Sequence, residues 1–174
     1  MEFAQQFGEL EQHPFLDASG DHEQVVRFEK GEDISGYENL WHSDVSWREI
    51  PSLGSVLHAV AVPEVGGDTL WAAMEAAYER LPEAVREQID GAIAVHDFSH
   101  SFGRMLSAAQ LAEKQKEFPA VEHPVVRTHA VTGRKSIYVN VVFTSHIVGM
   151  ERAESDELLR FLYRQASFPE YQCR

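Results

Sequence analysis

The segments of this chain with the composition of β-strands are short, and long irregular or helical stretches separate them. Ser55–Val62 is apolar on both alternating faces, as a strand buried on two sides would be. Further strand candidates are Gln24–Phe28, Ala92–His96, Val125–Thr128 and Ile137–Val142. No regular βαβ alternation and no G-x-G-x-x-G turn occur, which argues against a dinucleotide-binding domain. We therefore expect a mainly β fold, built on a mostly antiparallel sheet with helical insertions.

Four helices are expected after residue 70. Ala72–Arg80 is helical in composition, and Pro82 fits the first turn of the next helix. Ser107 and Gln110 form a capping box for a third helix. Ser155 is expected to cap the last helix, where Asp156 and Glu157 suit the first turn. The apolar stripe of that helix consists of Leu158, Leu159, Phe161 and Leu162.

Length and charge narrow the possible function classes. The 174 residues, 44% of them hydrophobic, predict one domain over residues 1–174. The chain has 28 acidic and 15 basic residues, which argues against binding to nucleic acid or to an anionic membrane. The single cysteine, Cys173, excludes an internal disulfide framework and a Cys-rich zinc site. Neither a signal peptide nor a membrane span is recognisable, so we expect a cytoplasmic protein and leave a homo-oligomer open.

The most informative stretch for chemistry is LWHSDVSW, residues 40–47. In an extended chain, His42 and Asp44 project to the same face, because residues i and i+2 share a side. An imidazole and a carboxylate supply two of the three ligands of the 2-His-1-carboxylate arrangement in non-haem Fe(II) oxygenases. An isolated H-x-D is more often structural, with the aspartate bonding a turn and the histidine in a polar network. The spacing alone leaves both interpretations open.

Further motifs follow in a fixed order along the chain. They are WHSD (41–44), GGDTLW (66–71), AAYERLP (76–82), HDFSHSF (96–102), HPVVRTH (123–129) and TGRKSIYVN (132–140). Together they closely resemble the taurine dioxygenase / 2,4-dichlorophenoxyacetate dioxygenase (TauD/TfdA) family, over nearly the whole chain. Members of this family depend on Fe(II) and 2-oxoglutarate. The resemblance implies a double-stranded β-helix (jelly-roll) core with helical insertions.

The resemblance also implies roles for individual residues. It makes His42 and Asp44 the first two iron ligands, and Thr69 a hydroxyl donor to the distal carboxylate of 2-oxoglutarate. A threonine hydroxyl can donate to an anion without adding a charge. Three residues align with positions that hold the acidic group of the substrate or line its pocket: His13, Phe102 and Phe143.

Some positions depart from the family pattern. Taurine-specific members should have a tyrosine near Leu16 and an asparagine near Glu38, and the chain has neither, which argues against taurine as the substrate. Trp47 stands where a phenylalanine is usual and adds bulk. The family pattern also continues past Arg174, with the second histidine ligand and an arginine for 2-oxoglutarate. We therefore expect an internal fragment, with the jelly roll incomplete at its C-terminal side.

These features predict a 2-oxoglutarate-dependent dioxygenase. The enzyme would use O₂ to hydroxylate a small acidic organic substrate (a sulfonate, sulfate ester or aryloxy acid), with release of succinate and CO₂. One alternative is a catalytically inactive jelly-roll domain that binds a small anion or a metal, and another is a hydrolase with zinc on His42 and Asp44. Of the other histidines, His58 is expected in the core, and His96 and His100 are expected to have structural roles.

Overall fold

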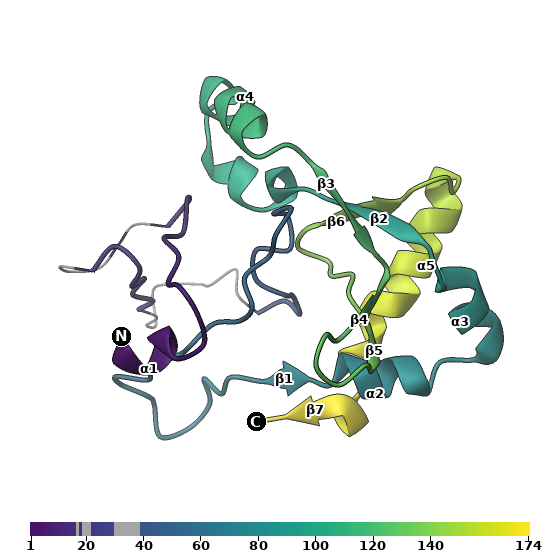
Figure 1. The fold of residues 1–174 in the computed structure, drawn as a ribbon, viewed down its shortest axis with the longest axis horizontal. Coiled ribbons are helices and arrows are strands. Elements are labelled where there is room, and N and C mark those ends of the chain that lie inside the picture. Colours follow the sequence, from purple (N-terminus) through teal and green to yellow (C-terminus); the bar gives the residue numbers. More distant parts are fainter. Residues whose placement is uncertain (17, 19–21, 30–38) are drawn as a thin grey trace.

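The computed structural model describes residues 1–16, 18, 22–29 and 39–174. Figure 1 shows two parts of different character. Up to about residue 70 the described chain is irregular, and its one regular element is the short helix α1 (Glu2–Gln5). The remaining helices and all the strands of the described residues follow from residue 71 onward.

Antiparallel pairing joins the strands into three small sheets. In the central sheet β2 (Ile93–His96) lies between β3 (Val121–Pro124) and β6 (Thr144–Ile147). The other two pairs are β4 (Val126–Thr128) with β5 (Lys135–Ile137), and β1 (Trp71–Ala72) with β7 (Gln172–Cys173). The antiparallel pairing agrees with the expected class, whereas the described strands do not join into one double-stranded β-helix.

The four expected helices are present. They are α2 (Met74–Glu79), α3 (Glu83–Ile89), α4 (Ala108–Glu117) and α5 (Arg152–Gln165), and three 3₁₀ turns accompany them, at Phe98–His100, Phe102–Met105 and Pro169–Tyr171. The capping box of α4 is confirmed, because the Ser107 hydroxyl accepts from the Gln110 N–H while the Gln110 side chain accepts from the Ser107 N–H.

The predicted cap of α5 is wrong. Glu151 caps this helix, and its carboxylate accepts from the N–H groups of Ala153 and Glu154. Ser155 lies within the helix, fully buried, where its hydroxyl accepts from the Ile147 N–H of β6 at 2.8 Å. Of the predicted stripe, Leu158, Leu159 and Leu162 are buried, whereas Phe161 is exposed.

Two hydrophobic clusters hold the molecule together. The larger one packs the helices against the sheets, with Ile89, Ala94, Val125, Ile147 and Leu162 at its centre. The smaller one, called here the aromatic cluster, combines residues from both parts of the chain. Its members are the buried Val45, Trp47, Phe98 and Phe143 and the partly buried Phe15, Phe102 and Phe118.

Three strand predictions need correction. Ser55–Val62 is not a strand and is exposed, with Val60 at 91%, because no strand of the described residues lies beside it to cover its two faces. His58 is therefore exposed instead of buried in the core. Gln24–Phe28 also forms no strand. In place of the strand predicted at Ile137–Val142, the structure has β5 over Lys135–Ile137, followed by irregular chain and a turn at residues 141–143.

Across the part of the chain that the structure describes, no helix is long and apolar enough to cross a membrane.

Candidate metal centre

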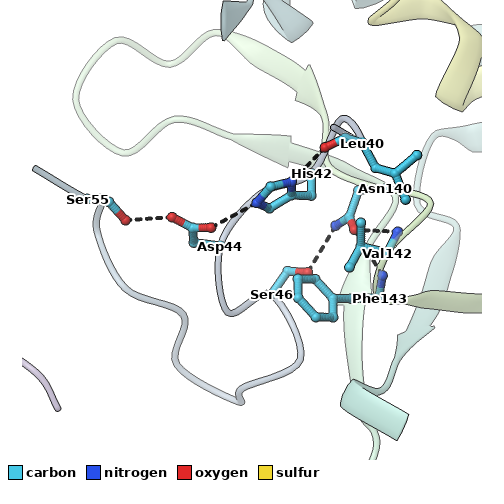
Figure 2. Close-up of polar contacts among 8 residues, drawn as sticks. All are labelled: Leu40, His42, Asp44, Ser46, Ser55, Asn140, Val142 and Phe143. Carbon is cyan, nitrogen blue, oxygen red and sulfur yellow. Dashed lines mark hydrogen bonds and ion pairs between the residues drawn. The ribbon is translucent and has the colours of Figure 1, made fainter. Parts of the chain in front are cut away.

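His42 and Asp44 direct their side chains at each other, as Figure 2 shows. Nε2 of His42 lies 3.1 Å from Oδ1 of Asp44. Nδ1 of His42 lies 2.7 Å from the Leu40 carbonyl oxygen, and the Ser55 hydroxyl donates to Oδ2 of Asp44 at 2.6 Å. The predicted convergence of the two side chains is confirmed. Each also has a second partner that fixes its orientation.

The contact with Leu40 indicates which ring nitrogen of His42 carries the proton in the neutral ring. A carbonyl oxygen only accepts, so Nδ1 carries a proton, and Nε2 of the neutral ring presents a lone pair. That lone pair faces a carboxylate oxygen at 3.1 Å, which requires either a second ring proton or a cation between the two atoms. Two ligand atoms at about 2.1 Å from one ion, at right angles, lie about 3 Å apart. The pair therefore fits two adjacent positions around a metal ion.

The two donors are reachable from solvent. The side chain of His42 is 30% exposed and that of Asp44 is 55% exposed. The hydrogen bond with His42 holds the pKa of the Asp44 carboxyl below its usual value, against the effect of partial burial. The aspartate is therefore ionised at neutral pH, as a metal ligand must be.

A tight turn at Asp44–Trp47 carries this pair. The Arg48 N–H donates to the Val45 carbonyl at 3.0 Å, and Val45 has a left-handed backbone with φ of 46°. Exposure changes sharply along the turn, since Asp44 faces solvent while the next three residues, Val45, Ser46 and Trp47, are buried. The added bulk of Trp47 thus lies in the aromatic cluster beneath the turn.

Beneath the turn lies a network of buried polar groups. Nδ2 of Asn140 donates to Oγ of Ser46 at 3.0 Å, and Nδ1 of His96 lies 3.0 Å from the same oxygen. Burial lowers the pKa of His96 to about 4, and the neighbouring His123 adds to the effect, so its ring is neutral at pH 7. His96 ends β2 and His100 lies in the following 3₁₀ turn, so the two share no helix face. The predicted structural role of His96 is confirmed by its contacts.

The N-terminal segment closes over this site. Arg48 donates to Glu11 at 2.6 Å, and the Ser52 hydroxyl donates to the same carboxylate oxygen at 2.7 Å. His13 follows, half-buried, with its ring centroid 5.2 Å from that of Phe102. Burial lowers the pKa of His13, the Asp44 carboxylate opposes that effect and Arg48 adds to it. His13 is thus within electrostatic reach of the metal centre.

A row of rings connects His13 with the metal centre. The Phe102 ring stacks on Phe143 at 6.1 Å, and the Phe143 ring meets His42 edge-on at 6.5 Å. An open cavity of about 700 Å³ lies at the far end of this row, and its lining includes His13, Phe102, Leu16, Phe15 and Lys114. The structure therefore brings together five of the six predicted site residues.

Thr69 is the sixth. It is exposed, just ahead of β1, and takes no part in the contacts described above. Its role toward 2-oxoglutarate stays a prediction. Of the two positions that bear on taurine, Leu16 lines the cavity, whereas Glu38 lies outside the described residues. Among the residues that the structure describes, no group of three or more His, Cys, Asp or Glu side chains is placed to hold a metal ion.

Sequence reasoning missed the residues that support the metal ligands. Ser46, Ser55 and Asn140 received no role, although Ser46 and Asn140 lie within the motifs quoted above. An asparagine after a strand predicts a turn, because its side chain can accept from the backbone two residues ahead. That signal would have found the bond from the Val142 N–H to Oδ1 of Asn140.

Comparison with known proteins assigns the chain to a family. Residues 1–174 match the family model described as "Taurine catabolism dioxygenase TauD, TfdA family". With the fold and the His42–Asp44 geometry described above, this match shows that the chain belongs to the TauD/TfdA family of 2-oxoglutarate-dependent dioxygenases.

Individual relatives agree with this assignment. The chain is 33% identical over 175 residues to an alkylsulfatase of Acinetobacter baylyi, covering 97% of this chain and 54% of the relative. It is 36% identical over 149 residues to the alpha-ketoglutarate-dependent 2,4-dichlorophenoxyacetate dioxygenase of a Burkholderia species, covering 84% and 50%. A crystal structure of a taurine dioxygenase from Burkholderia xenovorans superposes with a TM-score of 0.77 at 32% identity, covering 98% and 55%. The chain spans about half the length of these relatives.

Proposed function

We propose that this protein is an Fe(II)- and 2-oxoglutarate-dependent dioxygenase in which His42 and Asp44 are two of the iron ligands. The observation that carries the proposal is the 3.1 Å approach of Nε2 of His42 to Oδ1 of Asp44, with the other ring nitrogen bonded to a carbonyl. Bound Fe(II) would activate O₂ as 2-oxoglutarate is oxidised to succinate and CO₂, with one oxygen atom delivered to the substrate.

The contacts of the two ligands define what this chain contributes to metal binding. The Leu40 carbonyl keeps the proton of the neutral ring on Nδ1 of His42, so that Nε2 would be the atom that binds the metal. The Ser55 hydroxyl occupies Oδ2 of Asp44 and leaves Oδ1 for the ion. Thr69 is proposed, from the family resemblance, to donate its hydroxyl to the distal carboxylate of 2-oxoglutarate.

The proposed substrate is a small acidic organic molecule, a sulfonate, a sulfate ester or an aryloxy acid. The cavity at the His13 end of the row of rings supports this class, because aromatic side chains and the cationic Lys114 line it, together with the acidic Glu117. His13 is proposed to hold the acidic group, and Phe102 and Phe143 to enclose the apolar part. The row of rings that runs from His13 through Phe102 and Phe143 to His42 supports a substrate site on the same side of the molecule as the proposed iron.

A titration with Mn(II), followed by electron paramagnetic resonance, tests the ligand assignment. We expect His42→Ala and Asp44→Ala to weaken Mn(II) binding at least tenfold, because each removes one of two donors. His146→Ala is the matched control, because the ring of this half-buried histidine bonds the neighbouring Ser145 instead. Equal Mn(II) affinity in all four proteins would overturn the assignment.

Succinate formation tests the reaction class. A protein that joins this chain to the second histidine ligand and the arginine of the family pattern is incubated with Fe(II), 2-oxoglutarate and, separately, an alkyl sulfonate, an alkyl sulfate and an aryloxyacetate, whereas residues 1–174 alone are expected to give no measurable succinate. Succinate that depends on one of these substrates and on His42 supports the dioxygenase. Metal binding at His42 and Asp44 without succinate would instead support the alternative of a metal-binding domain of the same family.

A further inference from the structure

We propose that Ser46, His96 and Asn140 are positioning residues that hold the turn carrying His42 and Asp44 in its ligand-binding shape. The inference rests on the proposed function, since it assigns these residues to the metal centre described above. It follows from the geometry beneath the turn, where the three side chains meet at one oxygen atom.

That oxygen is Oγ of Ser46, which is fully buried. Both Nδ1 of His96 and Nδ2 of Asn140 lie 3.0 Å from it, and Figure 2 shows the Asn140 contact directly below the metal ligands. His96 is also fully buried, and its Nε2 lies 3.4 Å from Oγ1 of Thr144. Two segments distant in sequence thus converge on Ser46, the residue two positions after Asp44.

The chemistry of these groups allows a complete order of hydrogen bonds. The Asn140 amide can only donate from Nδ2, so Oγ of Ser46 accepts there. The Ser46 hydroxyl is then free to donate to Nδ1 of the neutral His96, whose remaining proton points from Nε2 to Thr144. Since each buried group has a partner, the network specifies a single position for Ser46.

The backbone of the turn shows why such a fixed position matters. Val45 is β-branched, yet its φ of 46° lies in the left-handed region that such residues avoid. A conformation of this kind persists only where its surroundings enforce it, and such residues gather at functional sites. Val45 lies between Asp44 and Ser46. The network holds Ser46, the residue that follows the strained position, while Asp44, the proposed metal ligand, precedes it.

Asn140 also fixes the backbone of residues 142 and 143, which lie beside the turn. Its Oδ1 accepts from the N–H groups of Val142 and Phe143, at 3.1 and 3.0 Å. The Phe143 ring in turn contacts His42. One asparagine therefore fixes both the turn, through Ser46, and the ring that packs against the first ligand.

Three variants separate positioning from general stability. Ser46→Ala removes the hydroxyl at nearly constant size, and Ser46→Thr restores a hydroxyl. Ser155→Ala is the matched control, because Ser155 is equally buried and its hydroxyl, which lies in α5, accepts one backbone hydrogen bond from Ile147 of β6 and none from Ser46, His96 or Asn140. If Ser46→Ala does not fold, Asn140→Asp replaces it, since it removes the donor to Ser46 and keeps an oxygen for Val142 and Phe143.

The readouts are amide hydrogen exchange of residues 44–48 and the broadening of their NMR signals by Mn(II). We expect Ser46→Ala to speed exchange in the turn about tenfold and to reduce the Mn(II) broadening at least threefold, because a buried network loses its central partner. Ser46→Thr should recover most of both effects. Ser155→Ala should lower global stability and leave both readouts of the turn unchanged.

The outcomes distinguish this inference from the proposed function. Unchanged exchange and unchanged broadening in Ser46→Ala would overturn the positioning role, as would equal effects of Ser46→Ala and Ser155→Ala. A wild-type protein whose His42 and Asp44 signals do not respond to Mn(II) would instead overturn the metal centre itself, while the exchange data would still report whether the network holds the turn.

Discussion

The two parts of the molecule divide structure and chemistry between them. Residues 71–174 contain the paired strands, the four longer helices and the larger hydrophobic cluster. The described residues before 71 have one four-residue helix, yet they supply His13, His42, Asp44 and Thr69. Irregular segments carry much of the site, and an ordered scaffold positions them, which is a common division in enzymes.

The contacts between the parts show how an irregular segment is held. Beyond the Ser46 network, Nε2 of the buried His123 donates to the Arg48 carbonyl at 2.9 Å. The aromatic cluster adds Val45 and Trp47 to the rings of Phe98 and Phe143. The turn at the metal centre therefore depends on the later part of the chain for its shape, and the following predictions test that dependence.

The largest expected effect is on stability, and it comes from making the same substitution, leucine to alanine, in each of the two parts of the chain. Leu162 is 0% exposed in α5, whereas Leu53, in the irregular first part, is 86% exposed. Leu162→Ala should lower the free energy of unfolding by about 2–5 kcal/mol, through lost burial and the cavity left behind. Leu53→Ala should change it by less than about 0.5 kcal/mol. Urea unfolding of both variants measures the change in the free energy of unfolding. An equal decrease in the two variants would contradict the view that residues 71–174 form the scaffold on which the earlier part depends.

The next effect is a pH dependence from His96. An unfolded chain protonates this histidine below about pH 6.5, whereas the folded protein resists protonation down to about pH 4. Stability is therefore unaffected above pH 6.5 and falls as the pH is lowered from 6.5 to 4, by up to about 3 kcal/mol. His96→Gln should flatten this decrease in urea unfolding. The control His58→Gln replaces an exposed histidine of the first part, and a flattening there as well would contradict the assignment to His96.

A smaller effect is expected on the local stability of the N-terminal segment when its hydrogen bonds to the region after the turn are weakened. Glu11→Gln weakens its contacts with Arg48 and Ser52, so we expect faster amide exchange at residues 11–16 and a loss of about 1 kcal/mol or less. Glu29→Gln is the control, because Glu29 forms an exposed pair with Arg27, a neighbour in sequence. If amide exchange at residues 11–16 is the same in both variants, the hydrogen bonds of Glu11 do not hold the His13 segment in place.

Sequence reasoning succeeded where the signal is local. The capping box of α4 involves residues three apart, and the approach of His42 to Asp44 involves residues two apart. Sequence reasoning failed where the structure of a segment depends on a residue that is distant in sequence. Serine is a residue type that often caps helices, but Ser155 lies inside α5, where its hydroxyl accepts a hydrogen bond from the Ile147 N–H of β6. Ser55–Val62 has the composition of a buried strand, but its exposure is set by neighbours that its own residues do not specify.

The same limit explains why the positioning residues were missed. Ser46 is 50 residues from His96 and 94 residues from Asn140 along the chain. No periodicity or spacing connects positions so far apart, and a buried hydroxyl has no compositional signature. The proposed ligands follow from a resemblance between motifs, whereas the groups proposed to orient them are recognisable only in three dimensions.

The central claim is that His42 and Asp44 bind one metal ion together. A crystal structure of the protein soaked with Mn(II), with anomalous data collected near the manganese absorption edge, tests it most directly. The account predicts an anomalous peak about 2.0–2.3 Å from both Nε2 of His42 and Oδ1 of Asp44, with Nδ1 still bonded to the Leu40 carbonyl. A peak at other residues, or an unchanged direct contact between the two side chains with no peak nearby, would contradict it.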